Sequence, residues 1–173
     1  MHSLETENVM EHTCQVTIIA HALAVIKNKI YGGNVDLLKV MMYSLYHETG
    51  EVSTGDLPTP VKYYNDDIKK AYKALEKVSC EKIANTLPED LIDEFLPYIL
   101  ADENDEEYVI MKSADKISAY LKCLTELKLG NNEFKKAKNT IEKEIKSKKL
   151  PEVEYFMKKF VPAFEKTLDE LDY

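Results

Sequence analysis

Apolar side chains recur at steps of three and four residues along most of this chain, a spacing that predicts helices with one buried face. In the first such segment, residues 7–29, Val16, Ile19 and Leu23 fall on one side of the helix. Further helices are predicted over residues 37–48, 66–85, 88–100, 108–129, 133–149 and 151–171. No stretch shows the alternation of a strand, so the pattern predicts an all-α bundle of about six or seven helices in a single domain, residues 1–173.

Two segments differ from the rest. Residues 108–129 are apolar around most of the helix circumference, which predicts a helix at the centre of the bundle. Residues 50–65, with Gly55, Pro58 and Pro60, form the least helical stretch. This stretch is predicted to be a loop or a short irregular helix, and loops of this length are often functional.

The charge balance excludes two classes of partner. The chain carries 31 acidic and 23 basic residues, a formal net charge of −8, which argues against binding to nucleic acid or to an anionic membrane.

No apolar run approaches the ~20 residues that span a bilayer. The first residues lack a basic region followed by an apolar stretch, so no signal peptide is expected. We therefore expect a cytoplasmic protein.

Every basic residue other than histidine is a lysine, because the sequence contains no arginine. Arginine is the usual bidentate partner of phosphate, whereas lysine offers a point charge. A protein of this composition that acts on phosphate needs another source of positive charge, and a metal ion is the obvious one. The lysine runs between residues 135 and 149 alternate with glutamate and apolar positions, and we expect them to be solvated helix faces.

The three cysteines, Cys14, Cys80 and Cys123, are widely spaced and form no Cys-x-x-Cys pair. This pattern argues against a disulfide framework or a thiolate zinc site. We expect all three to be buried, reduced thiols.

Histidines provide the first candidate metal ligands. His12 lies four, seven and eleven residues before Val16, Ile19 and Leu23, so it points inward, whereas His21 falls on the opposite side and is expected to be exposed. Taken alone, His12 is better explained as a core histidine with its hydrogen bonds satisfied than as a metal ligand.

A second histidine lies next to a carboxylate. His47 and Glu48 are adjacent near the end of a predicted helix, and Glu51 follows four residues after His47, where it could orient a metal-bound water. The His-Glu-x-x-His zinc signature is absent, because position 51 is a glutamate.

Asp115 is a carboxylate in the middle of the apolar segment 108–129. A charge in such a place is costly unless it is paired or hydrogen-bonded. An ion pair with Lys112 or Lys116 is one explanation, and a metal site is the other. Two imidazoles with carboxylates make a mixed nitrogen and oxygen site that suits Zn, Mn, Co or Fe.

The ordered set Glu11-His12, His47-Glu48 and Ala114-Asp115 resembles the H…HD…D signature of HD-domain phosphohydrolases. Longer segments resemble the bacterial HD-domain 5′-deoxynucleotidases, the YfbR-like family, nearly throughout the chain and in register. These segments are residues 7–13, 55–63 (Gly-Asp-Leu-Pro-Thr-Pro-Val-Lys-Tyr), 119–124, 130–134 and 155–162.

The resemblance implies an HD-domain helical bundle that forms a homodimer and holds one divalent metal ion. It implies removal of the 5′-phosphate from deoxynucleoside 5′-monophosphates to give deoxynucleoside and phosphate. By the resemblance, Glu51 assists the attacking water. The positions that match the family's metal ligands are His12, His47, Glu48 and Asp115. The positions that match its nucleotide-binding loop are Asp56, Leu57, Pro58 and Thr59, of which Asp56 favours a deoxyribose over a ribose.

The chain departs from the family pattern in two places. The His-Asp pair of the family is His47-Glu48 here, which keeps the charge and both oxygens but adds one methylene. The family's Arg-Trp pair helps hold phosphate and sugar and lies just upstream of the first residue of this sequence, which contains neither residue type. Either the sequence is a shortened form that starts after the pair, or another group replaces the pair, with Lys62 as the candidate. Two alternatives stay open on this basis: a phosphohydrolase of another nucleotide, and a nucleotide-binding or regulatory module that has lost turnover.

Overall fold

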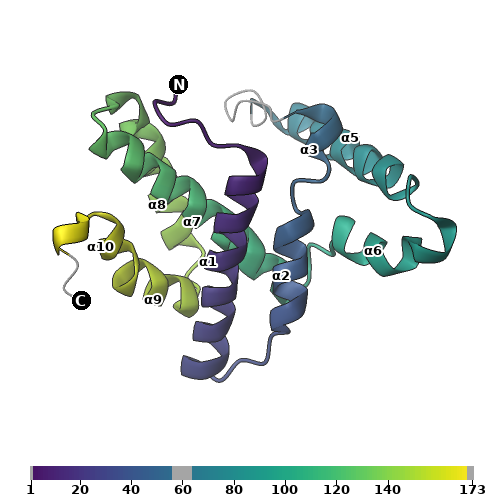
Figure 1. Ribbon diagram of the computed structural model, residues 1–173, viewed down its shortest axis with the longest axis horizontal. Helices are drawn as coiled ribbons and strands as arrows, with labels where there is room; N and C mark the ends of the chain where they lie inside the picture. The colour runs from purple at the N-terminus through teal and green to yellow at the C-terminus, as the bar shows by residue number, and fades with distance from the viewer. Residues whose placement is uncertain (1, 56–63, 171–173) are drawn as a thin grey trace.

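The computed structural model describes residues 2–55 and 64–170, which are helical for most of their length and contain no strand (Figure 1). The all-α prediction is therefore confirmed. The helices are α1 (Val9–Ile30), α2 (Leu37–Tyr46), α3 (Glu51–Thr54), α5 (Asp66–Ala84), α6 (Ile92–Ile99), α7 (Glu106–Lys128), α8 (Lys135–Ser147), α9 (Pro151–Lys159) and α10 (Val161–Phe164). Short 3-10 turns, η1 (Glu89–Leu91), η2 (Asn132–Phe134) and η3 (Leu168–Glu170), complete the described structure.

The centre of the fold is the packing of α1 against α7, with α2, α8 and α9 around them (Figure 1). Val16 and Leu23 of α1 and Ile110, Ile117 and Leu121 of α7 are each no more than 3% exposed. Burial of such side chains stabilises the fold by roughly 1.5–3 kcal/mol each. The prediction that residues 108–129 form a central helix is confirmed.

Helix α1 is the only helix within the described ranges that could cross a membrane by length and composition alone. Its buried residues, which include Val16, Ile19 and Leu23, belong to the same core cluster as those of α7. Packing within the protein thus accounts for the buried face of α1, whereas Met10 and Ile18 on the same helix are exposed.

A capping box fixes the start of α1. The Asn8 side chain accepts hydrogen bonds from the backbone amides of Met10 and Glu11, and the Glu11 carboxylate accepts one from the Asn8 amide. Such a cap contributes about 1 kcal/mol and sets where the first turn begins. His12 lies in this first turn, so the cap also fixes its place in space.

A second apolar cluster joins α5 and α6 on the other side of α2 (Figure 1). The turn after α2 lies directly against α5, where the Ser79 hydroxyl donates to the Gly50 carbonyl over 2.8 Å. A Cβ at position 50 would lie 3.2 Å from Cys80 Sγ and 3.2 Å from the Glu76 carbonyl oxygen, so only glycine allows this approach without displacement. The turn that carries His47 and Glu48 is held in place by this contact.

A buried carboxylate anchors the N-terminal segment to the far end of α7. Glu126 is 1% exposed and accepts hydrogen bonds from the backbone amides of Leu4 and Glu5, the Ser3 hydroxyl and the Asn131 side chain. The amide of Leu4, followed by the Ser3 hydroxyl, lowers the pKa of Glu126 to about 2. Nothing in the local sequence pattern indicated this role.

Three sequence expectations need correction. The second helix ends at Tyr46 rather than residue 48, and His47 and Glu48 lie in the following turn. The last predicted helix, 151–171, breaks after Lys159, because Pro162 has no amide proton to donate to the helix. Cys14 is exposed, because two residues of helix turn it about 200° away from the buried Val16; Cys80 and Cys123 are buried as expected.

Candidate metal centre

Three side chains that are far apart in the sequence meet at one point. His12 comes from the first turn of α1, His47 from the end of α2 and Asp115 from the middle of α7. One ligand atom from each lies within 4.8 Å of the others. The nearest pair is His12 Nε2 and Asp115 Oδ1 at 3.3 Å, and the two imidazole centroids are 5.5 Å apart. The arrangement of the helices brings together three of the predicted ligands.

The environment of His47 fixes its tautomer. Its Nδ1 lies 2.6 Å from the Ser44 carbonyl oxygen, which can only accept, so Nδ1 carries the proton. In the neutral ring Nε2 then keeps its lone pair, and this nitrogen is buried and has no hydrogen-bond partner among the described residues. Metal-binding histidines typically donate their other nitrogen to a carbonyl or carboxylate in this way.

The neighbour of this unpaired nitrogen is Glu48. Its Oε1 lies 3.0 Å from His47 Nε2 and 4.0 Å from His12 Nε2. Two lone pairs at 3.0 Å repel each other unless a proton or a cation lies between them. A separation of this size is what two ligands about 2.1 Å from a shared metal ion would show. Glu48, with its extra methylene, therefore borders the cluster of His12, His47 and Asp115.

His12 is oriented by a hydrogen-bonded pair on its other side. The Ser118 hydroxyl donates to Gln15 Oε1 over 2.7 Å, and its oxygen lies 3.4 Å from His12 Nδ1, where it can accept a hydrogen bond from the ring. This leaves Nε2 directed at Asp115 and Glu48. The hydrogen bond with Asp115 raises the pKa of His12, against the opposing effect of burial.

Both carboxylates of the cluster are held in their charged form. Burial acts to raise the pKa of Asp115, but its hydrogen bond with His12 and the charge of Lys112 outweigh this and hold the pKa well below its ordinary value. Burial likewise opposes the shift at Glu48, where the adjacent His47 lowers the pKa. Two carboxylates with two imidazoles form a donor set that fits a divalent cation.

Asp115 makes one of the expected ion pairs and also faces the candidate ligand cluster. Oδ1 faces His12, and Oδ2 lies 3.4 Å from Lys112 Nζ. Lys116, the other candidate partner, pairs with Glu144 instead.

Glu51 is the first residue of α3, and its backbone amide donates to the Glu48 carbonyl over 3.0 Å. The chain thus continues through a tight turn from His47 to Glu51, and Glu51 is half-buried beside the cluster. The predicted nucleotide-binding residues Asp56, Leu57, Pro58 and Thr59 lie outside the described residues, as does Lys62.

A cavity of about 940 Å³ opens next to these side chains between α2, α5, α6 and α7. His47, Glu48, Glu51 and Asp115 line it. Sequence reasoning missed several further lining residues, notably Tyr43, Tyr98, Tyr108, Lys112 and Lys148. The spacing of Tyr108, Lys112 and Asp115 at steps of four and three residues is a signal that could have placed them on one helix face.

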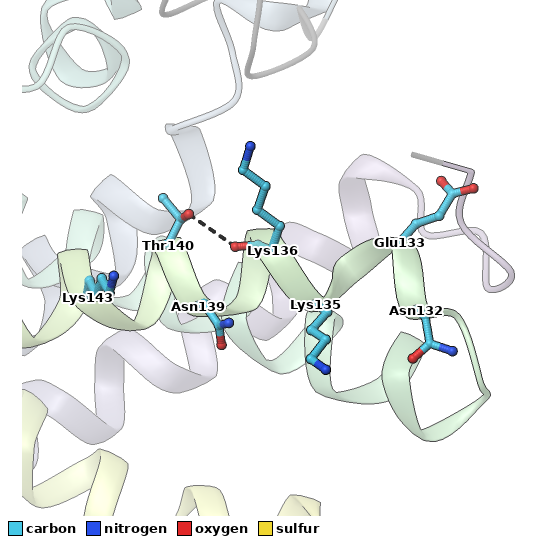
Figure 2. A pocket seen from close by; sticks show the side chains of 7 residues that line it. All are labelled: Asn132, Glu133, Lys135, Lys136, Asn139, Thr140 and Lys143. Atoms are coloured by element: carbon cyan, nitrogen blue, oxygen red, sulfur yellow. Dashed lines mark hydrogen bonds between the residues drawn. The ribbon is translucent and has the colours of Figure 1, made fainter.

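A second hollow, of about 530 Å³, lies over α8 and η2, away from the metal cluster (Figure 2). Its lining includes Lys135, Lys136, Asn139 and Thr140. Lys135 and Lys136 are exposed and extend to different sides of the helix (Figure 2). This hollow contains no residue of the predicted site, and its lysines form a solvated helix face, as expected.

Comparison with solved structures identifies the architecture. An HD-domain phosphohydrolase from Listeria innocua superposes with a TM-score of 0.82 at 21% identity, over 94% of this chain and 79% of that one. A protein from Pyrococcus horikoshii superposes with a TM-score of 0.68 at 20% identity, over 94% of this chain and 85% of that one. At these identities the likeness shows the HD-domain fold alone.

Sequence comparison is more specific. The family described as 5′-deoxynucleotidase YfbR-like matches residues 1–164. The 5′-deoxynucleotidase YfbR of Escherichia coli is 49% identical over 99% of this chain and 86% of its own length. A 5′-deoxynucleotidase of Vibrio vulnificus is 47% identical over 99% of this chain and 89% of its own length. With its helices, its ligand cluster and its sequence in agreement, the chain belongs to the YfbR-like 5′-deoxynucleotidase family of HD-domain proteins.

Proposed function

We propose that this protein is a metal-dependent phosphomonoesterase that removes the 5′-phosphate from deoxynucleoside 5′-monophosphates. The observation that carries the proposal is the unpaired, buried Nε2 of His47 beside His12 and Asp115, in a chain about half identical to 5′-deoxynucleotidases. The products are deoxynucleoside and orthophosphate. We further propose that residues 1–173 form a single domain, that the protein is a homodimer and that it is cytoplasmic. These three proposals are supported by the membership of the chain in the YfbR-like family.

In this proposal His12, His47, Glu48 and Asp115 hold one divalent ion, which is Co, Mn, Zn or Fe. A divalent ion in this site supplies positive charge and Lewis-acid activation near neutral pH. The Ser44 carbonyl and the Ser118–Gln15 pair keep the two imidazoles oriented for binding. The longer side chain of Glu48 already reaches to 3.0 Å from His47 Nε2, which supports its inclusion in the set.

Glu51 acts on the attacking water. Its carboxylate accepts a proton from the water as the oxygen bonds to phosphorus, and the bond from phosphorus to the 5′-oxygen of the sugar breaks. Glu51 then returns this proton to the leaving sugar oxygen, which gives the free hydroxyl of the deoxynucleoside and restores the carboxylate. Asp56 to Thr59 contact the sugar and base in this proposal, with Asp56 discriminating against a ribose.

The test is a substrate panel with released phosphate as the readout. Deoxynucleoside monophosphates, ribonucleoside monophosphates, deoxynucleoside triphosphates and cyclic nucleotides are each incubated with the purified protein and added Co, Mn or Zn. We expect phosphate release from the deoxynucleoside monophosphates in preference to the others. Faster hydrolysis of another class would identify a different nucleotide as substrate. An absence of bound metal and of metal-stimulated turnover would instead identify a binding module.

A further inference from the structure

We propose that Lys112, with Lys148 beside it, binds the phosphate group of the substrate next to the metal cluster, an inference that rests on the proposed phosphatase function. A substrate phosphate carries nearly two negative charges, and proteins usually meet them with arginine. This chain has no arginine. Besides a metal ion, a lysine close to the ligands is the cation that these residues offer for this part.

Lys112 has the required position. It lies on α7 three residues before Asp115 and lines the same cavity as His47, Glu48 and Asp115. Its side chain is 40% exposed, and its Nζ lies 3.4 Å from Asp115 Oδ2, a long contact for an ammonium group. An ammonium has three protons to donate, and no other hydrogen bond from Lys112 is found among the described residues. The remaining protons are available to an anion in the cavity.

Lys148 adds a second cation from a different helix. It follows the last residue of α8 and lines the same cavity. It forms no ion pair with the residues that the structure describes, and burial together with the nearby charges of Lys116 and Lys112 lowers its pKa. Lysines that face one cavity repel each other, and a bound anion relieves this repulsion.

Two other lysines that line the cavity already pair with a carboxylate outside the ligand cluster, so they have fewer protons available to donate to a phosphate. Lys73 donates to Glu103 over 2.9 Å, and Lys116 pairs with Glu144. Among the lysines that line the cavity, Lys112 is the one directly beside a metal-ligand candidate. It would therefore contact a phosphate that approaches the cluster.

The competing explanation is that Lys112 only neutralises Asp115. The two explanations differ in what the loss of Lys112 changes. If Lys112 served Asp115 alone, its removal would change metal binding and leave the affinity for phosphate at the metal-loaded site unaltered. If it binds phosphate, its removal weakens phosphate binding at full metal occupancy.

The experiment compares Lys112→Met, Lys112→Arg and Lys148→Met with Lys128→Met, a control on the same helix. Lys128 is exposed and does not line the cavity. Each variant is saturated with Mn or Co, and its metal content is measured. Binding of orthophosphate, the product, is then followed by calorimetry and by inhibition of turnover, with KM and kcat recorded separately.

We expect Lys112→Met to weaken orthophosphate binding and raise KM by about tenfold to hundredfold, the loss expected for a charge-assisted hydrogen bond. Lys148→Met should show a smaller change in the same direction, Lys112→Arg should recover part of the loss, and Lys128→Met should match the parent. Unchanged orthophosphate affinity in Lys112→Met at full metal occupancy overturns the inference. If the parent hydrolyses no deoxynucleoside monophosphate yet binds orthophosphate through Lys112, the proposed function fails while this site stands.

Discussion

The Ser44 carbonyl oxygen lies 2.6 Å from His47 Nδ1, and this single contact decides which nitrogen of the ring faces the ligand cluster. A backbone carbonyl can only accept, so the ring donates from Nδ1 and presents a bare Nε2 to His12, Glu48 and Asp115. Ser44 lies on α2, one turn before His47. The helix that positions the ring therefore also determines which of its two nitrogens faces the ligand cluster. The metal affinity of the site therefore depends on backbone geometry as well as on the ligands.

Removing a proposed ligand should remove metal and activity together. We expect His12→Ala to lower metal affinity by more than the roughly 10–100-fold that loss of an outer hydrogen-bond partner costs. Elemental analysis of the purified variant and phosphate release measure the two effects. His21→Ala is the matched control, because His21 lies on the same helix and is exposed. Full metal content in His12→Ala would exclude His12 as a ligand.

Glu51 should affect turnover without affecting metal content. Loss of a general base typically slows a reaction by about 10²- to 10⁴-fold, and we expect Glu51→Gln to lower kcat within this range. The neutral amide is nearly isosteric, so the turn after α2 should stay intact. If Glu51→Gln turns over substrate at the parental rate, the role assigned to Glu51 is wrong.

Metal binding should stabilise the fold, because His12, His47 and Asp115 meet only when three helices are assembled. An ion at about 100 times its Kd adds about 2.7 kcal/mol to the free energy of unfolding. Thermal denaturation after chelation and after return of the metal measures this gain. His47→Ala should show the same melting temperature with and without metal, and a metal-dependent rise in that variant would contradict the assignment.

The stability of the fold should fall in acid partly through Glu126. Its pKa in the folded protein is about 2, below its ordinary 4.5. A lowered pKa means that the carboxylate stabilises the fold above about pH 4.5, and that this contribution is lost as the pH falls towards 2. Urea unfolding between pH 7 and pH 3 should show a weaker pH dependence for Glu126→Gln than for the parent. Glu165→Gln, which removes an exposed carboxylate, should follow the parent curve.

The close approach of the α2–α3 turn to α5 predicts a penalty at Gly50. A methyl group there meets Cys80 Sγ and the Glu76 carbonyl oxygen, both at 3.2 Å. We expect Gly50→Ala to lower the free energy of unfolding by about 1–3 kcal/mol, as overpacking does, and to lower activity by displacing Glu48. Ser53→Ala, at an exposed position of α3, is the control. Parental stability in Gly50→Ala would show that the turn can shift without cost.

The sequence was informative where one helix carries the signal. The inward face of α1 and the apolar circumference of α7 are enough to predict that His12 and Asp115 lie on the core side. The sequence alone did not indicate which residues from distant segments come into contact. Lys148 and Lys112 share a cavity only because α8 packs on α7, and Glu126 is buried only because residues 3–5 fold back onto it. The roles of Asp56 to Thr59 stay predictions.

The pairing of α1 with α7 also has a consequence for how the protein is made. Helix α1 ends at Ile30, whereas α7 begins at Glu106 and ends at Lys128. At a synthesis rate of about 5–20 residues per second, the ribosome needs about 5–20 s to deliver the roughly one hundred residues that separate these two helix ends. Throughout that interval α1 can pack on the neighbouring α2, but the part of its face that meets α7 has no partner and stays exposed on the nascent chain.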